Sequence, residues 1–219
     1  MIKKNIKFSI AIDGSSASGK TTGSKFIAKK FKFNLLSSGM LYRYLSYKII
    51  KNDNKYNKKF IVNQSKSITL KKLENKKLYN PKVTKLASII AKKKFIRNSL
   101  KQFQKNFIKK NKKVIIEGRD IGSVIMPSAD LKIYFKCSIK EKAKRRLKEF
   151  KKINKKITLK EVEKALKSRD FSDKNRKESP LLFVKGAVLV DTTKLTIKQM
   201  QLKLVKLVKK KLFNKYGNI

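Results

Sequence analysis

Short apolar runs alternate with longer amphipathic stretches along the whole chain. The apolar runs have the length and the Val, Ile and Phe content of buried strands, which predicts strands at residues 8–12, 33–36, 114–116, 131–135 and 187–190. Apolar positions at helical spacing predict helices at 20–31 and 40–50, and others that begin near residues 82, 94, 138, 158 and 196. This alternation predicts an α/β fold, in which helices flank a parallel β-sheet of about five strands and ligands bind at the carboxyl ends of the strands.

Residues 52–80 interrupt the alternation. They are rich in Lys and Asn and contain only a weak strand-like segment at 67–73. With 219 residues, the chain has the length of one domain, or of one domain with an insert. We therefore expect a single domain over 1–219 that includes a small insert at about 52–95.

The composition excludes several kinds of chemistry. The chain has no histidine, which removes Ser/His and Cys/His nucleophile pairs, His-ligated zinc sites and the most common general base. Its one cysteine, Cys137, excludes an internal disulfide and a multi-cysteine metal cluster, and is typical of a reducing compartment. No apolar stretch approaches the roughly 20 residues that a membrane-spanning helix needs, so we expect a cytoplasmic protein.

The charge is strongly positive, with 60 Lys and Arg against 14 Asp and Glu and a net charge of +46. Lysine supplies 53 of the 60 basic residues and is spread through every predicted helix. This spread favours a compositional bias over a nucleic-acid-binding patch, in which the charges would cluster. Where such a chain keeps arginine, we expect a planar fork that binds phosphate or a base edge. The arginines are Arg43, Arg97, Arg119, Arg145, Arg146, Arg169 and Arg176.

A complete GxxxxGK[ST] motif follows the first predicted strand and opens a helix. Its residues are Gly14, Ser15, Ser16, Ala17, Ser18, Gly19, Lys20 and Thr21. In such a loop the backbone N–H groups surround a β-phosphate and the lysine reaches the β- and γ-phosphates. Thr21 or Thr22 would offer a hydroxyl to Mg²⁺, directly or through water. The alternative is an ordinary glycine turn before a helix, but the motif and its context predict a site for a nucleoside triphosphate.

Three further segments place polar residues near strand ends. They are LLSSGMLYR at 35–43, IEGRDIG at 116–122 and SRDFSDKNR at 168–176, and together they hold four of the seven arginines. Each has a structural alternative: a helix N-cap, a surface ion pair, and a ladder of exposed helical ion pairs, respectively. Because these cations converge on one sheet edge with the phosphate loop, we expect an anion among them.

These segments, together with IIEGRDIGSVIMPSADLKIYF and the closing VLVDTTKLTI, resemble bacterial-type cytidylate kinases of the P-loop nucleoside monophosphate kinase superfamily. The resemblance covers about 8–212, and GRDIG with RDxxDxxR separates this family from adenylate, guanylate and shikimate kinases. It implies phosphorylation of CMP and dCMP to CDP and dCDP by direct in-line transfer, with ATP as donor and Mg²⁺ as cofactor.

The resemblance implies roles for residues in and near the insert, which would form a shortened acceptor-binding region. Ser38, Tyr42 and Arg43 match the segment that cradles the acceptor monophosphate, with Arg43 on its phosphate. Ser88 and Arg97 lie where the family places a serine and an arginine against the base edge.

It also implies roles for the two later segments. Arg119 would serve the acceptor phosphate, and Asp120 would read the cytosine amino group. Arg169 and Arg176 would bind the transferring phosphates, and Asp173 the ribose hydroxyls. The catalytic residues would then be Lys20, Arg119, Arg169 and Arg176.

The chemistry of these residue types agrees with this assignment. A carboxylate such as Asp120 accepts a hydrogen bond from cytosine N4, whereas uracil presents a carbonyl oxygen that it repels. The nucleophile is a phosphate oxygen that is already largely ionised near neutral pH, so no histidine base is needed. Water must be excluded, which predicts a lid at about 138–180 that begins with Arg145 and Arg146.

The chain departs from the family pattern at two strand ends. Ser37 stands where an aspartate usually precedes SG, and Glu117 stands where Asp is more common before GRD. Two alternatives remain open: a P-loop kinase for another small acceptor such as UMP, and a basic nucleic-acid-binding protein with a secondary ATP site. We expect a monomer that binds CMP, dCMP and ATP but no specific nucleic acid and no membrane, with 202–213 as a last helix on the sheet.

Overall fold

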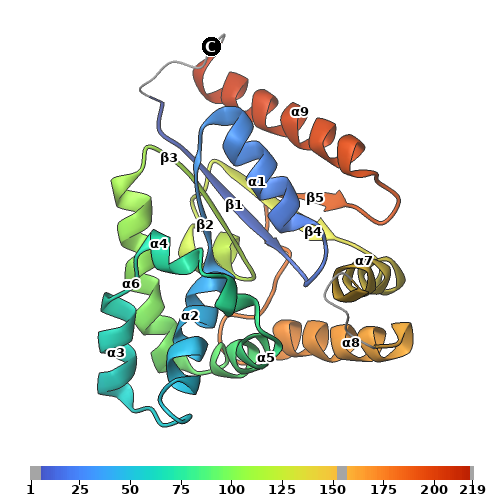
Figure 1. The fold of residues 1–219 in the computed structure, drawn as a ribbon. Coiled ribbons are helices and arrows are strands. Elements are labelled where there is room, and N and C mark those ends of the chain that lie inside the picture. The colour runs from blue at the N-terminus through green and yellow to red at the C-terminus, as the bar shows by residue number, and fades with distance from the viewer. Residues whose placement is uncertain (1–5, 152–156, 218–219) are drawn as a thin grey trace. The chain divides into compact units, whose positions relative to one another are not determined.

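Five strands form one sheet in the computed structural model, which describes residues 6–151 and 157–217 (Figure 1). They are β1 (Phe8–Gly14), β2 (Asn34–Ser37), β3 (Lys113–Gly118), β4 (Leu131–Lys136) and β5 (Ala187–Asp191). The strand order is β2-β3-β1-β4-β5, and β1 pairs in parallel with β3 and β4, as does β4 with β5. The predicted α/β fold with a parallel five-stranded sheet is confirmed.

The chain forms two compact units. The first comprises Met1–Leu35 and Lys112–Ile219, and the second comprises Leu36–Asn111. The Lys- and Asn-rich stretch predicted as an insert at about 52–95 falls within the second unit.

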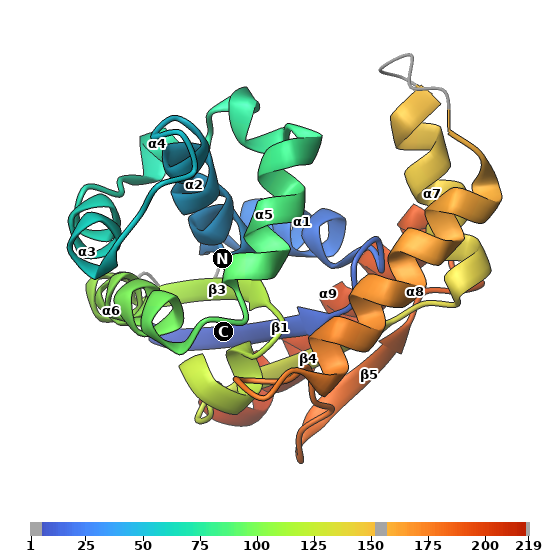
Figure 2. The same cartoon turned by 90° about the horizontal axis from the view of Figure 1, so that it is seen from below.

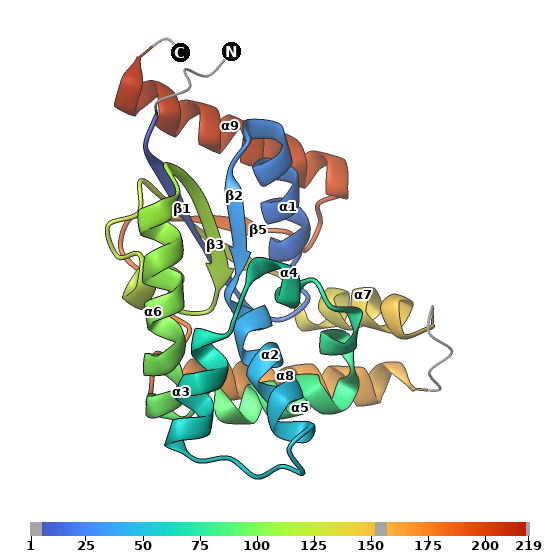
Figure 3. The same ribbon diagram turned by 60° about the vertical axis from the view of Figure 1, so that its left-hand side comes forward.

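Helices α1 (Lys20–Phe31) and α9 (Ile197–Tyr216) cover one face of the sheet in the first unit (Figures 1 and 3). The alternating apolar residues of β1 and β4 point into this layer and meet Leu204 and Val208 of α9, all fully buried. Packing is close at Gly23, where a Cβ would lie 2.8 Å from Leu204 and 2.9 Å from Phe135. The predicted last helix therefore packs on the sheet.

Helices α7 (Ile139–Lys151) and α8 (Leu159–Asn175) form an antiparallel pair with a small apolar core of their own (Figure 2). Ala143, Val162 and Leu166 are buried between them. Thr158 begins α8 through a capping box with Glu161, in which each side chain bonds the other residue's backbone N–H. This pair occupies the region predicted as a lid at about 138–180.

The second unit is helical. It contains α2 (Ser38–Ile50), α3 (Lys58–Lys66), α4 (Leu70–Leu73), the 3-10 turn η1 (Lys76–Tyr79), α5 (Pro81–Ile90) and α6 (Lys94–Lys110). The strand-like segment predicted at 67–73 is wrong, because the Thr69 hydroxyl accepts from the Lys72 N–H and starts α4. Leu73 then turns inward, so these apolar residues follow a helical and not an alternating spacing.

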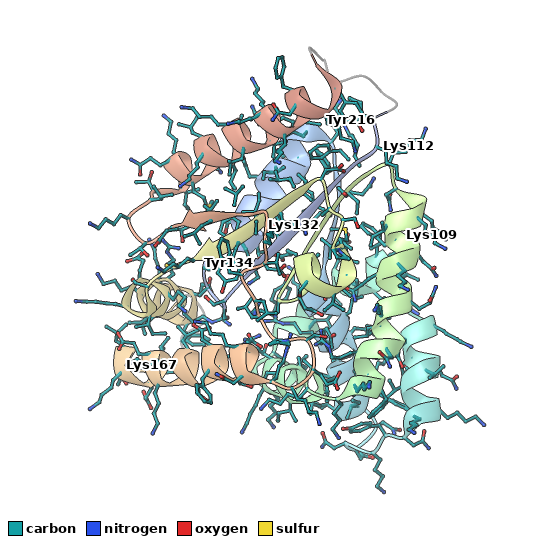
Figure 4. All side chains as sticks on the ribbon, turned by 180° about the vertical axis from the view of Figure 1, so that it is seen from behind. Lys109, Lys112, Lys132, Tyr134, Lys167 and Tyr216 are labelled. Atoms are coloured by element: carbon teal, nitrogen blue, oxygen red, sulfur yellow. The ribbon has the colours of Figure 1, made fainter. Side chains whose placement is uncertain are left out.

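None of the helices formed by the described residues is long and apolar enough to cross a membrane. Lysines project from many different elements in Figure 4, where the labelled Lys109, Lys112, Lys132 and Lys167 lie on or beside α6, β3, β4 and α8. This distribution agrees with a compositional bias.

Candidate active site

The loop from Gly14 to Lys20 joins β1 to α1 and is shaped by its small residues. Ala17 and Gly19 adopt left-handed backbone angles, with φ of 57° and 89°. A Cβ on Gly14 would lie 2.5 Å from the carbonyl oxygen of Phe135, so no side chain fits where the loop leaves the sheet. Ser18 Oγ donates to the Ser15 carbonyl at 3.0 Å and closes the turn. The predicted phosphate loop thus lies at the carboxyl end of the central strand.

Lys20 is buried within this loop. Its Nζ donates to the Ser15 carbonyl at 3.0 Å, which folds the side chain back over the loop. Burial, and then the nearby positive charge of Arg119, lowers the pKa of Lys20 to about 7. Bound phosphate oxygens would reverse this shift, because they stabilise the charged ammonium.

Thr21 and Glu117 bring two kinds of oxygen ligand together beside the loop. Glu117 is a buried residue, the last but one of β3, and both of its carboxylate oxygens lie 2.9 Å from Thr21 Oγ1. Mg²⁺ is commonly held by one or two protein oxygens plus phosphate and water, so this pair fits the ion. Thr22, the other predicted hydroxyl ligand, is exposed one residue further along α1.

A carboxylate that the sequence analysis missed positions the GRD segment. Asp13 accepts hydrogen bonds from the backbone N–H groups of Ile121 (2.8 Å) and Gly122 (2.7 Å), which start the short π-helical turn η2 (Ile121–Ile125). Burial raises the pKa of Asp13 to about 6, against the opposing effect of these two bonds. Asp13 thereby fixes the turn that follows Arg119 and Asp120, and Asp120 is buried.

Two predicted segments meet at Asp173 of α8. Arg119 Nε donates to Asp173 Oδ2 at 2.7 Å, and Arg176 lies 3.6 Å from Oδ1. Burial favours the neutral acid, but Arg119, with further contributions from Arg169 and Arg176, outweighs it and holds the pKa of Asp173 below its usual value. The alternative of an exposed helical ion-pair ladder is wrong, because Asp173 is buried and its closest partner comes from a strand end 54 residues away.

Charged side chains of the first unit surround Lys20. Glu117, Arg119, Arg169 and Asp173 all act on the charge of Lys20, so the strand ends and α8 contribute to one electrostatic cluster. The expected convergence of the GRD and RDxxDxxR segments on the phosphate loop is therefore observed.

The two arginines predicted to begin the lid differ. Arg145 uses its fork on Thr192, donating to Oγ1 at 3.1 Å and to the carbonyl at 2.8 Å. Thr192 in turn donates to the Ser18 carbonyl at 2.9 Å, which connects Arg145 to the phosphate loop. Arg146 pairs with Glu149, whose side chain is 59% exposed, and so lies on the solvated side of α7.

Lys142 is a second site residue that the sequence analysis did not identify. Its buried ammonium group donates to Ser15 Oγ at 3.2 Å and pairs with Asp170. Sequence spacing could not single it out, because it is one of 53 lysines.

In the second unit, cation–π contacts hold two predicted arginines. Arg97 lies 5.6 Å from the ring of Tyr42 and donates to the Ala91 carbonyl at 3.0 Å. Arg43 lies 5.2 Å from the ring of Tyr79. Both contacts fix the direction of the guanidinium group.

The two predicted serines of this unit have different surroundings. Ser38 is buried at the start of α2. Ser88 donates to the Lys85 carbonyl of its own helix at 2.7 Å, a contact typical of a helix-surface serine.

A phosphate loop at the end of a central parallel strand, with basic residues from a helical pair directed at it, defines a P-loop kinase. The sequence model of the cytidylate kinase family matches residues 10–210. The chain belongs to the cytidylate kinase family.

Similar proteins include the cytidylate kinase of Fusobacterium nucleatum, 39% identical over 207 residues that cover 87% of this chain and 92% of the relative. The cytidylate kinase of Mycoplasmoides gallisepticum is 35% identical over 218 residues, covering 95% and 96%.

Among solved structures, a gluconokinase from Sinorhizobium meliloti matches with a TM-score of 0.54 at 11% identity, covering 97% of this chain and 98% of that one. A protein from Eubacterium ventriosum matches with a TM-score of 0.55 at 14% identity, covering 92% and 98%. At such identity these structures support the fold alone.

Proposed function

We propose that this protein transfers the γ-phosphoryl group of ATP to CMP, and to dCMP, by direct in-line attack. Family membership supports the reaction. The observation that carries the assignment is the meeting of Arg119 and Arg176 on Asp173 near Lys20, because it joins the two family-specific segments to the phosphate loop.

The donor side consists of Lys20 and the backbone N–H groups of Gly14–Thr22, which bind the phosphates of ATP. Thr21, Glu117 and, through water, Thr22 would hold Mg²⁺, which neutralises phosphate charge when bound. Arg169 and Arg176 stabilise charge on the transferring group. Alignment and charge neutralisation account for the catalysis, since the acceptor phosphate is already ionised near neutral pH.

The acceptor site binds CMP at both its phosphate and its base. Arg43 and Arg119 bind its phosphate, while Asp120 accepts from the cytosine amino group. Asp173 binds the ribose hydroxyls, which requires it to exchange part of its contact with Arg119 for the sugar. Ser38, Tyr42, Ser88 and Arg97 complete the acceptor site that the family resemblance implies.

We also propose that the chain acts as a cytoplasmic monomer with the α7–α8 pair as its lid. A closed lid excludes water, which would otherwise hydrolyse ATP. The chain has a single cysteine, Cys137, which is typical of a reducing compartment.

An acceptor panel tests the proposal. Purified protein with ATP and Mg²⁺ is assayed for ADP formation with CMP, dCMP, UMP and AMP, and the products are identified by chromatography. We expect CMP and dCMP to be used at least about tenfold better than UMP, because Asp120 faces a carbonyl instead of an amine in uracil. Equal use of UMP would contradict the role of Asp120, and ADP formation that no acceptor increases would contradict kinase activity.

A further inference from the structure

Lys142 is an unusual lysine in this chain. Among the described residues, only two lysines are buried: Lys20 in the phosphate loop and Lys142 in the first turns of α7, where the residue is 3% exposed. Burial of an ammonium group is costly unless anions or hydrogen-bond acceptors surround it. The lysine-rich composition explains the many lysines on the surface, but it does not explain why Lys142 is buried.

The ammonium of Lys142 faces the phosphate loop. It donates to Ser15 Oγ at 3.2 Å and forms an ion pair with Asp170 Oδ2. Lys20 donates to the carbonyl of the same serine at 3.0 Å. Two buried ammonium groups, from α1 and α7, therefore converge on Ser15, which is the second residue of the loop.

The hydrogen bonds of Lys142 leave capacity for a ligand. An ammonium has three N–H donors, and the bonds to Ser15 and Asp170 use two of them. These two bonds thus hold the ammonium in place from one side and leave its remaining donor for another acceptor.

A purely structural role explains this arrangement less well. Helix α7 is already joined to the loop by Arg145, through Thr192 to the Ser18 carbonyl. The α7–α8 pair also has its own apolar core. A second attachment gains nothing from a buried ammonium group, whereas a phosphate ligand would be stabilised by one.

We propose that Lys142 is a second lysine that binds the terminal phosphates of the donor nucleotide, and that Asp170 is the positioning residue that directs its ammonium toward the loop. This inference rests on the proposed kinase activity. Because Asp170 directly follows Arg169, the same turn of α8 orients both a phosphate-binding arginine and Lys142. The α7–α8 pair would then hold two cations against the donor phosphates together.

The test compares nucleotide binding by Lys142→Met, Lys142→Arg and Asp170→Asn with that of the unmodified protein. Binding of the non-hydrolysable analogue AMPPNP and of ADP is measured by calorimetry with Mg²⁺, together with the KM for ATP and for CMP. Lys144→Met is the matched control, because Lys144 is an exposed lysine of the same helix.

We expect Lys142→Met to weaken AMPPNP binding by about tenfold or more and ADP binding by less, with the KM for CMP little changed. Lys142→Arg should restore most of the affinity, Asp170→Asn should weaken it less than Lys142→Met, and Lys144→Met should behave like the unmodified protein. Unchanged AMPPNP affinity in Lys142→Met, with only a lower melting temperature, would overturn the proposal. Equal losses of AMPPNP affinity in Lys142→Met and Lys144→Met would also overturn it.

Two further measurements keep the outcomes distinct. If Lys142→Met does not fold, as judged by circular dichroism, Lys142→Gln replaces it in the same comparison with Lys142→Arg. If the unmodified protein binds AMPPNP but phosphorylates neither CMP nor dCMP, the proposed function fails while the role of Lys142 in binding is still decided by the affinities.

Discussion

Replacement of Arg119 by lysine keeps the positive charge at the end of β3 and removes the planar fork. The guanidinium donates through Nε to Asp173 at 2.7 Å and through Nη1 to the Gly118 carbonyl at 3.2 Å, so its orientation is fixed from two sides. A lysine ammonium can reach one of these acceptors but cannot hold both and also present a second parallel donor to a phosphate.

The magnitude follows from the hydrogen bonds that the substitution removes. A hydrogen bond to a charged group contributes about 1.5–3 kcal/mol. The bond to Asp173 is already present without substrate, so the loss in kcat/KM comes from the bond to the acceptor phosphate: at the upper end of this range it costs the transition state about 3 kcal/mol, which corresponds to about 100-fold or more in kcat/KM for CMP. The lysine preserves the charge that acts on Lys20, so the Kd for ATP should change by no more than about threefold.

Steady-state kinetics with CMP and calorimetry with ATP check this expectation. Arg146→Lys is the matched control, because Arg146 pairs with the exposed Glu149 and lies over the ring of Phe150 on its own helix, and the same exchange should leave both quantities unchanged. Unchanged turnover in Arg119→Lys would refute the argument that arginine is needed here as a bidentate donor. Equal losses in both variants would show that the effect is not specific to the site.

Three other expectations follow from the loop and the core of the first unit. Because the pKa of Lys20 is lowered to about 7, ATP binding should take up close to one proton at pH 8 and almost none at pH 6. Calorimetry in buffers of different ionisation enthalpy measures this proton uptake. Equal uptake at the two pH values would contradict the lowered pKa of Lys20. Gly14→Ala should lower the free energy of unfolding by about 2 kcal/mol or more in denaturant titrations and abolish ATP binding, since its Cβ would overlap the Phe135 carbonyl. Burial raises the pKa of Asp130, but the hydrogen bond from Lys215 and those from Ser9 outweigh it and hold the pKa below its ordinary value. The stability that this carboxylate contributes is present above its unfolded pKa and is lost as the pH falls through its lower folded pKa. Asp130→Asn should therefore cost about 1 kcal/mol at pH 7, and this cost should shrink as the pH falls below the ordinary pKa of 3.8.

Periodicity predicted the elements that form the sheet. The run at 8–12 became β1 because its alternate apolar residues face α1 and α9 and every residue of the run except Ser9 is buried. Periodicity failed at 67–73, where a four-residue helix is too short for spacing to separate it from a strand. The deciding contact was local, the Thr69 cap, and it belongs to turn chemistry that an apolar pattern does not report.

The candidate site was predictable where its residues stand in an informative motif and hidden where their role depends on contacts that only the folded chain makes. Motif spacing found Lys20, Arg119 and Asp173, since each stands in a segment whose order along the chain is informative. It could not find Asp13, whose role depends on backbone N–H groups more than 100 residues away. Such contacts are set by sheet register, in which Asp13 lies opposite Gly118 of β3.

The contrast between lysine and arginine explains why the sequence pointed to Arg119 and did not point to Lys142. Arginine is scarce in this chain, and at Arg119 and Arg145 the structure shows one planar guanidinium that bonds two acceptors in fixed directions, a geometry that lysine lacks. Arg146 has no such use, so scarcity alone does not establish function. Lysine is abundant, and Lys142 emerges only through burial, which is a property of the folded chain. In a protein of this composition the exposed fraction of a lysine therefore discriminates function better than its place in the sequence, because only a buried ammonium demands an anion.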